Sequence, residues 1–194
     1  MTELFLSKPA LRYKNSFLEA VREVQAERAS NPFSATMAEN HLDIDQLRDD
    51  FLFEGFLEKM ERESLATTTD ENGYVPNTTL WLIGRAADDT EVFIGRVNIR
   101  HYLTEKLRNT FGHSGFLIRP TERDKGYGRS LLQLALFKAK EIVTDAEKFD
   151  HKVLITCRAN NAISQKIIIG AGGIFERSVI LPSGESELLH WVPL

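Results

Sequence analysis

The residues from Arg123 to Gly128, with the sequence RDKGYG, have the types and spacing of an anion-binding turn. Glycine has no side chain, so Gly126 and Gly128 let the backbone turn sharply and approach a ligand closely. The N–H groups that begin a helix have no partner inside the helix, and they point toward any anion that approaches the helix end. Because a helix-like pattern follows, this stretch predicts a turn that holds a phosphate or pyrophosphate group.

An ordinary strand-to-helix loop is the alternative, since two glycines among charged residues are common. The spacing Arg-x-x-Gly-x-Gly favours phosphate binding. A Walker P-loop is excluded because no Gly-Lys-Ser/Thr follows at the required offset. A dinucleotide-binding fingerprint is also excluded, because its third glycine position is occupied by Leu131.

Length and composition predict one folded domain over residues 1–194. With 24 Lys plus Arg against 28 Asp plus Glu, the net charge is −4, so we expect no binding to nucleic acid or to acidic membranes. The N-terminus lacks the pattern of a signal peptide, and no run of ~18 or more apolar residues occurs. We therefore expect a cytoplasmic protein, and we expect no metal ion.

The single cysteine, Cys157, lies in the apolar run of residues 153–157, so no intramolecular disulfide can form. A small buried core residue is the favoured interpretation, and a nucleophile is the alternative.

Two amphipathic helices are expected near the N-terminus, over residues 11–28 and 44–63, with Asn31 and Pro32 ending the first. Residues 4–6 form only a short apolar opening before them. The second helix carries an apolar stripe that we expect to lie in the core, although it could instead line an acceptor pocket. The stripe consists of Leu47, Phe51, Leu52, Phe56, Leu57 and Met60.

Patterns typical of strands follow the two predicted helices along the chain. Residues 79–84 and 91–100 predict an antiparallel hairpin, and residues 101–108 predict one or two helical turns. Residues 116–118, a helix from near Ser130, and residues 153–157 form a strand, helix, strand unit long enough for a parallel crossover. Residues 144–151 predict a solvated loop or a frayed helix end.

The C-terminal segment predicts one more helix, over residues 161–169, and strands at 174–181 and 188–192 around the turn at 182–184. We expect the final strand to be an exposed edge, where two copies could pair as a homodimer.

Several segments accompany the glycine turn. They are YVPNTTLW (74–81), IRHYL (99–103), GHSGF (112–116) and TCRANNAIS (156–164), the last followed by Gly172 and Gly173. With these segments, about two-thirds of the chain, from Gly73 to the C-terminus, resembles the GNAT N-acetyltransferase superfamily, in particular a bacterial branch with unassigned substrates. The turn matches the acetyl-CoA signature Gln/Arg-x-x-Gly-x-Gly/Ala at Arg123, Gly126 and Gly128.

The resemblance implies an α+β (mixed α/β) fold. Its central sheet is mostly antiparallel, helices flank it, and two neighbouring parallel strands splay apart into a V-shaped cleft that takes acetyl-CoA. Residues 1–72 would supply helices on the acceptor side, and residues 73–194 would form the acetyl-CoA-binding core.

The resemblance also implies which residues bind the cofactor. The strand at 116–118 would pair with the pantetheine amides, the amides of 124–129 would hold the pyrophosphate, and Asn161 would contact the pantetheine arm. The full set is Phe116, Leu117, Ile118, Arg123, Asp124, Lys125, Gly126, Tyr127, Gly128, Arg129, Ser130 and Asn161. As alternatives, the basic residues are ordinary surface residues, and Asn161 and Ser164 cap a helix.

Acetyl transfer needs a neutral amine, a stabilised oxyanion and a route for the thiolate to leave. A strand amide near Ile118 would stabilise the oxyanion. The tyrosine that protonates the sulfur in many GNAT enzymes is replaced by Ile168, so water, Ser164 or another side chain would take its place. His113 is the first candidate for the base, and His101, Glu105 and His190 are weaker ones. For each candidate the alternative is a hydrogen-bonded or exposed residue without a catalytic role.

Two functions of different class follow. The first is an N-acetyltransferase that moves an acetyl group from acetyl-CoA to a primary amine of a small molecule or peptide. The second is a non-catalytic acyl-CoA-binding or regulatory protein, motivated by Ile168. A longer acyl-CoA is a third possibility. The acceptor, the acyl-chain length and the oligomeric state stay open.

Overall fold

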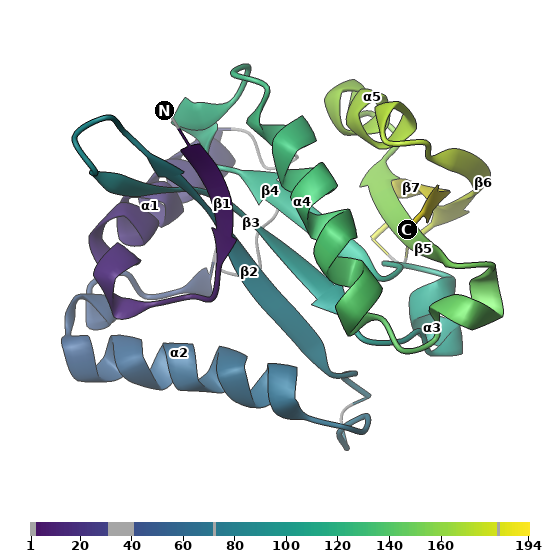
Figure 1. The fold of residues 1–194 in the computed structure, drawn as a ribbon, viewed down its shortest axis with the longest axis horizontal. Coiled ribbons are helices and arrows are strands. Elements are labelled where there is room, and N and C mark those ends of the chain that lie inside the picture. The colour runs from purple at the N-terminus through teal and green to yellow at the C-terminus, as the bar shows by residue number, and fades with distance from the viewer. Residues whose placement is uncertain (1–2, 31–40, 72, 182) are drawn as a thin grey trace.

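The computed structural model describes residues 3–30, 41–71, 73–181 and 183–194, and the strands in these ranges form one seven-stranded sheet. The strands are β1 (Glu3–Ser7), β2 (Asn77–Arg85), β3 (Glu91–Arg100), β4 (Ser114–Ile118), β5 (Lys152–Arg158), β6 (Ile174–Ile180) and β7 (Ser186–Pro193). Their order across the sheet is β1-β2-β3-β4-β5-β7-β6 (Figure 1). Of these neighbours, β4 and β5 are the one parallel pair, which confirms the predicted mixed fold with a mostly antiparallel sheet.

The helices cover both faces of this sheet (Figure 1). They are α1 (Lys14–Ser30), α2 (Asp50–Leu65), α3 (Glu105–Arg108), α4 (Tyr127–Ile142) and α5 (Ala162–Gly170), with 3-10 turns η1 (Leu11–Tyr13), η3 (Gln46–Arg48), η4 (Pro120–Glu122) and η5 (Ala146–Phe149). One buried cluster joins the sheet to α4 and α5, and a second joins it to α1 and α2. We call the two sides the α4 face and the α1/α2 face.

Strand β2 is apolar on both sides because both faces of the sheet are covered. Leu80 and Leu82 belong to the cluster on the α4 face, whereas Trp81 and Ile83 belong to the cluster on the α1/α2 face. This alternation follows from the strand backbone, in which successive side chains point to opposite faces. A strand buried on both faces therefore gives a continuous apolar run.

An aromatic cluster anchors α1 and α2 to the sheet. The ring of Phe17 stacks on Trp81 with centroids 4.5 Å apart and meets Phe93 edge-on at 5.3 Å. Phe53 of α2 lies 6.0 Å from Phe17, and all four side chains are fully buried. Aromatic contacts of this kind add to the free energy gained by burial.

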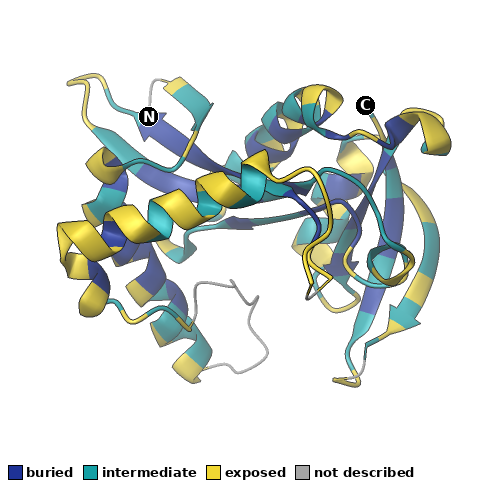
Figure 2. Ribbon diagram, turned by 90° about the horizontal axis from the view of Figure 1, so that it is seen from below, coloured by how far each residue is buried: buried dark blue, intermediate teal, exposed yellow. Residues whose placement is uncertain are grey.

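The predicted stripe of the second helix is wrong at two positions. Phe51 and Leu52 are 80% and 45% exposed, and the neighbouring Phe53 is fully buried instead. The helix begins at Asp50, after the cap residue Asp49. Helical spacing therefore applies only from Asp50 onward, and it determines which side chains face the core. Its apolar residues on that side are Phe53, Phe56, Leu57 and Met60. The outer side of α2 is largely exposed (Figure 2).

Other predicted elements are confirmed with small shifts at their ends. The hairpin is β2 and β3, and the crossover is β4, α4 and β5, with α4 beginning at Tyr127 rather than near Ser130. Strand β1, which pairs with β2, was not predicted, because one exposed and four half-buried residues at an edge give little pattern. The predicted end of the first helix at Asn31 and Pro32 lies outside the described residues.

Two predictions about the C-terminal half are wrong. The final strand β7 is not an edge, because it pairs with β5 on one side and β6 on the other, so β6 is the edge strand. Residues 144–151 are not simply a solvated loop, because they contain η5 and the buried Asp145.

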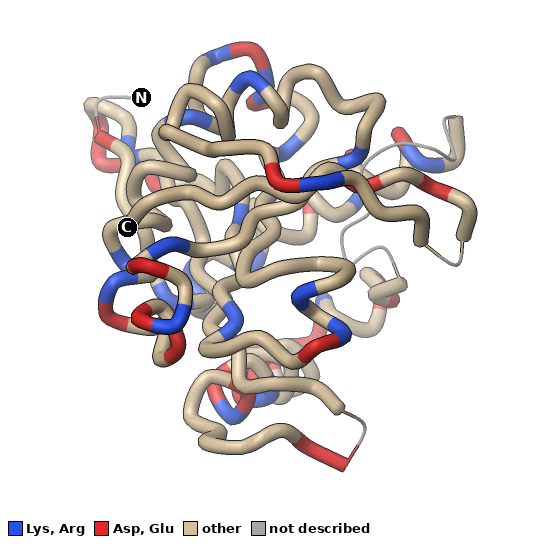
Figure 3. The backbone as a smooth tube through the Cα atoms, turned by 90° about the vertical axis from the view of Figure 1, so that its right-hand side faces the viewer, with Lys and Arg blue, Asp and Glu red and all other residues tan. Residues whose placement is uncertain are grey.

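Charge is mixed over the surface. Basic and acidic residues are interspersed on the side of the molecule that carries α5 and β6 (Figure 3).

We expect the aromatic cluster to carry much of the stability of the N-terminal half. Phe17→Ala should lower the free energy of unfolding by about 3–5 kcal/mol, because it removes a fully buried ring and leaves a cavity. Urea unfolding followed by circular dichroism measures this. The matched control is Phe51→Ala, which should change the free energy by less than about 0.5 kcal/mol, because that ring is exposed; equal losses in the two variants would contradict the burial described above.

Candidate active site

The glycine turn between β4 and α4 has an unusual backbone. Asp124 has a φ of 61° and Gly126 a φ of 82°, and Gly126 is the cap residue of α4. Within the described chain, the N–H groups of residues 124–128 donate no hydrogen bond, whereas the next ones, of Arg129 and Ser130, donate to the carbonyl of Gly126. A run of five consecutive free amides at a helix start is an anion-binding arrangement.

The second glycine has a different task. A Cβ on Gly128 would lie 2.8 Å from the side chain of Ile167 in α5. Glycine at this position lets the start of α4 approach α5 closely. Gly126, by contrast, has open space around its Cα and is required by its positive φ.

Strands β4 and β5 diverge beside this turn. They share one paired position, Ser114 with Ile155. The N–H of Arg119 donates to β3, to the carbonyl of Ile94 at 2.9 Å. Because alternate residues face the partner in an antiparallel ladder, Phe116 and Ile118 turn their peptide groups the other way, toward β5.

Arg123, the basic residue of the turn, is held by α1. Its Nη1 and Nη2 donate to the two carboxylate oxygens of Glu27 at 2.6 and 2.9 Å, and its Nε donates to the carbonyl of Ile118 at 3.3 Å. A fork of this kind fixes both position and orientation. The other basic residues of the turn are exposed, with Lys125 paired to Glu122 at 3.0 Å.

A second ion pair ties the same connection to α1. Arg119 contacts Glu23 at 2.7 Å and Glu19 at 3.3 Å. Burial by itself would raise the pKa of Glu23, but hydrogen bonds from Arg119 and Thr121 outweigh it and lower the pKa. Sequence reasoning missed these contacts, although glutamates at 19, 23 and 27 form a row along one side of the helix.

Asn161 and Ser164 lie at the start of α5. The side-chain oxygen of Asn161 accepts the N–H of Ser164 at 3.0 Å, so Asn161 is the N-cap of this helix. Ile168 is fully buried in the core on the α4 face.

His113 is fully buried next to β4. Its Nδ1 accepts the N–H of Leu154 at 2.9 Å, and its Nε2 lies 2.9 Å from Asp145. Because Nδ1 accepts a hydrogen bond, Nε2 carries the proton and donates it to the carboxylate. Asp145 also accepts the N–H of Leu103. The pair therefore ties β4, β5 and the segment after α4 together.

The weaker candidates for the base are dispersed. His101 bonds Thr78 at 2.9 Å, and burial lowers its pKa. Burial also lowers the pKa of His190, which is 2% exposed, and Glu105 lies exposed in the first turn of α3.

Sequence reasoning did not find Glu187, a buried carboxylate on β7. It is 8% exposed, and burial raises its pKa, against the attraction of Arg158. Burial and the charge of Glu187 raise the pKa of Cys157 to about 11. The thiol thus stays protonated at neutral pH and lies in the core, as predicted.

The sequence model of the Acetyltransferase (GNAT) family matches residues 41–168, and the chain belongs to this family. The protein is thus an acetyl-CoA-dependent N-acetyltransferase. No curated protein matches the chain. Among the helices in the described ranges, none is long and apolar enough to cross a membrane.

Solved structures agree in fold. The chain is similar to a ribosomal-protein-alanine N-acetyltransferase from Brucella melitensis, with 15% identity and a TM-score of 0.60 over 98% of this chain and 99% of that one. It is also similar to yncA from Salmonella typhimurium, solved with its cofactor acetyl-CoA, with 13% identity and a TM-score of 0.60 over 98% and 94% of the chains. The spermidine/spermine N-acetyltransferase SpeG from Vibrio cholerae has 13% identity and a TM-score of 0.53 over 98% and 94%.

The Asp145–His113 pair generates a prediction about pH. Burial alone would raise the pKa of Asp145, but hydrogen bonds from His113 and Leu103 lower it below its ordinary 3.8. A lowered carboxyl pKa adds stability that is present above 3.8 and is lost as the pH falls through the folded-state pKa. Asp145→Asn should therefore lower the free energy of unfolding by about 1–3 kcal/mol at pH 7, and the difference from wild type should shrink below pH 3.8.

Urea unfolding at pH 7 and at about pH 3.5 measures both effects. Asp150→Asn is the control, because Asp150 is 91% exposed and should show less than about 0.5 kcal/mol at either pH. A constant difference between Asp145→Asn and wild type over this range would contradict the linkage.

Proposed function

We propose that the protein transfers an acetyl group from acetyl-CoA to a primary amine, with the pyrophosphate bound at residues 124–128. The observation that carries this is the run of free amides at the start of α4, next to the divergent strands. Acetyl-CoA supplies the acetyl group as a thioester. The neighbour solved with acetyl-CoA supports this choice of cosubstrate.

In this proposal the residues of the chain bind acetyl-CoA and orient its thioester. The peptide groups of Phe116 and Ile118 face the gap beside β5, where they can pair with the amides of the pantetheine arm. The N–H of Ile118 would donate to the thioester oxygen as negative charge develops on it. The neutral acceptor nitrogen forms a bond to the acetyl carbon and releases one N–H proton to water, the C–S bond breaks, and its electron pair stays on sulfur as a thiolate.

The predicted site residues have different roles in the proposed binding of acetyl-CoA. Asp124, Lys125, Gly126, Tyr127 and Gly128 contribute main-chain amides, and the exposed Arg129 and the half-buried Ser130 border the site. Arg123 positions the turn through Glu27. The side-chain oxygen of Asn161 is engaged in capping, so its amide N–H groups would face the pantetheine arm, and Leu117 packs against Val24 of α1 rather than touching ligand.

For proton transfer we propose a change of assignment. His113 has no exposed surface, and both ring nitrogens are engaged, which supports a positioning role rather than that of the base. The general acid stays unassigned, with Ser164 or water as candidates, and a thiol pKa near 8.5 makes thiolate a tolerable leaving group.

The sequence left two alternatives, a non-catalytic acyl-CoA-binding or regulatory role and the use of a longer acyl-CoA, and membership of the acetyltransferase family disfavours the first. The deciding experiment measures coenzyme A release from acetyl-CoA with a panel of amino acids, polyamines and peptides. Acceptor-dependent release supports the proposed function. Tight binding of acetyl-CoA without release by any acceptor would favour the regulatory role, and faster release from a longer acyl-CoA would favour that substrate.

The remaining parts of the proposal concern organisation. We propose that residues 1–194 act as one domain, with residues 1–72 on the acceptor side. A homodimer and a cytoplasmic location also stay predictions, which sedimentation and cell fractionation test.

Gly126→Glu should weaken coenzyme A binding by at least about 30-fold, because a carboxylate would lie close to the amides that hold the pyrophosphate and repel it. Titration calorimetry measures the affinity. Gly126→Gln introduces a side chain of the same size as glutamate with the same backbone strain, and it should weaken coenzyme A binding by less than about fivefold. Gly73→Glu, at a comparable φ of 80° with open space around it, should leave affinity unchanged. Equal affinities of Gly126→Glu and wild type would overturn the placement.

A further inference from the structure

A pocket lies between α2 and the start of β2, at the place where β1 leaves the sheet. Strand β1 ends with Ser7 opposite Trp81, and the chain continues through Lys8 to Pro9. Proline has no N–H group to donate to a neighbouring strand, so it favours the end of the pairing. The pocket occupies the space that β1 leaves and has a volume of about 320 Å³. This volume is in the range of small-molecule sites.

The mouth of the pocket is acidic. Glu54, Glu58 and Glu61 of α2 line it at helical spacing, and Lys8 is the one cation among its described lining residues. Lys8 lies 3.7 Å from Glu61, and both side chains are largely exposed. The carboxylate of Glu54 has no partner among the described residues. Three carboxylates against one ammonium group favour a cation at this mouth.

The inner wall of the pocket is apolar apart from one hydroxyl group. Leu57 and Met60 are half-buried and line it, and methionine adapts its shape to what it contacts. Thr79 lies on the same face of β2 as Trp81, so its side chain points toward α2. This residue is 9% exposed, and its hydroxyl makes no hydrogen bond with the described residues. A buried hydroxyl without a partner costs free energy, so a ligand that bonds to it gains stability.

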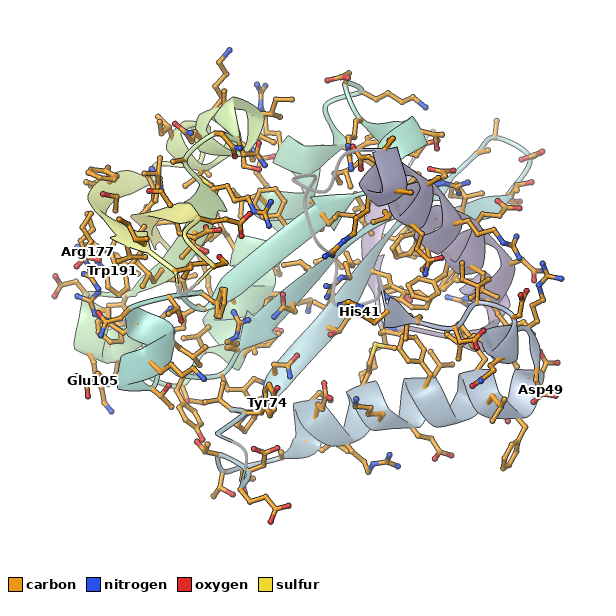
Figure 4. The ribbon with its side chains drawn as sticks, turned by 180° about the vertical axis from the view of Figure 1, so that it is seen from behind. His41, Asp49, Tyr74, Glu105, Arg177 and Trp191 are labelled. Carbon is orange, nitrogen blue, oxygen red and sulfur yellow. The ribbon has the colours of Figure 1, made fainter. Side chains whose placement is uncertain are left out.

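Helix α2 separates the pocket from the middle of the sheet. Glu54 and Glu63 lie on opposite sides of the helix, because nine residues make two and a half turns. Glu63 accepts a hydrogen bond from Asn77 at 3.3 Å, and Asn77 pairs with Arg100 of β3. The Glu63 side therefore faces the inner strands, whereas the Glu54 side faces the end of β1. Figure 4 views this face of the molecule, with Asp49 at the start of α2.

The pocket is also distant from the proposed acetyl-CoA site. Strand β3 lies between β2 and β4, and the gap beside β5 is on the far side of β4. Neighbouring strands are about 4.8 Å apart, so β2 and β4 are separated by about 10 Å. A small ligand in the pocket thus does not reach the thioester.

We propose that this pocket is a second ligand site, which binds a short aliphatic amine that carries a polar group at its far end, as an amino alcohol does. The ammonium group lies among the carboxylates at the mouth, the alkyl chain contacts Leu57 and Met60, and the far group bonds to the hydroxyl of Thr79. An anion would meet three carboxylates, and a simple alkylamine would leave the hydroxyl unpaired. The inference goes beyond the proposed function, because this ligand is not the acetyl acceptor.

The experiment follows the methyl signal of Met60 by NMR. The chain has three methionines, so isotope labelling of their methyl groups gives a simple spectrum, in which Met60→Leu assigns the signal. The full chain, saturated with coenzyme A, is titrated with aminobutanol, whose amino and hydroxyl groups are at opposite ends. Pentylamine and butanediol have the same number of heavy atoms and lack the hydroxyl and the ammonium group, respectively.

Aminobutanol should shift the Met60 signal and bind more tightly than either analogue. The advantage over pentylamine should be about 3- to 10-fold, the value of one hydrogen bond. The advantage over butanediol should be about 2- to 5-fold, because the carboxylates are exposed. The affinity for aminobutanol should be the same without coenzyme A, since the two sites are separate.

Two variants test the two ends of the ligand. Thr79→Val should remove the advantage over pentylamine and keep the advantage over butanediol, whereas Glu54→Gln should do the reverse. Partial unfolding weakens all three compounds alike and leaves both ratios intact. Thr67→Val and Glu105→Gln are the matched controls, because both residues are exposed and lie outside the pocket, and both ratios should keep their wild-type values.

Three results would overturn the inference. They are a Met60 signal that none of the compounds shifts, an advantage over pentylamine that persists in Thr79→Val, and binding of aminobutanol that coenzyme A abolishes. The last result would place the amine in the acetyl-CoA site. None of them bears on the proposed acetyl transfer, which the release of coenzyme A tests by itself.

Discussion

The divergence of β4 and β5 after one paired position is the constraint on which the rest of the structure depends. Backbone N–H and C=O groups in a protein interior need partners, and a sheet normally supplies them from both neighbouring strands. Here β3 pairs with one side of β4, and the peptide groups of Phe116 and Ile118 face the other side, from which β5 has diverged. Strand β3 lies very close to β4 at this point, because a Cβ on Gly95 would lie 2.4 Å from the carbonyl oxygen of Leu117.

The connection after β4 is held from a third direction, by α1. Glu23 and Glu27 engage Arg119 and Arg123 across about a hundred residues of sequence. These pairs are partly buried, and the Arg123 pair is bidentate, so they hold geometry better than exposed pairs do. Arg123, whose charge the linear motif assigned to phosphate, thus holds the turn in place through Glu27, and the main-chain amides of the turn are left without a partner among the described residues.

The extent of burial distinguishes the polar residues that hold the structure from the residues that stay accessible. His113 and Asp145 face each other in the interior and join three segments, whereas residues 124–126 of the turn at the start of α4 are exposed. The buried pair therefore helps to fix the position of β4, and the exposed turn keeps its main-chain amides accessible.

Local patterns in the sequence determined much of this architecture. The repeat along α4, the β2–β3 hairpin and the glycine turn all follow from periodicity or from the conformational freedom of glycine, which neighbouring residues suffice to express. The same patterns failed where a residue's environment comes from distant chain. Phe51 and Phe53 are the same residue type two positions apart, and only the docking of α2 decides which one is buried.

Tertiary structure alone decided the remaining features. It inserted β7 between β5 and β6, paired Arg123 with Glu27, and buried Glu187 beside Thr156. The physical reason is that hydrogen bonds, ion pairs and desolvation depend on separation in space, and a sequence specifies separation only along the chain. The motif could predict an anion-binding turn, but not which side chains lie around that turn in the folded chain.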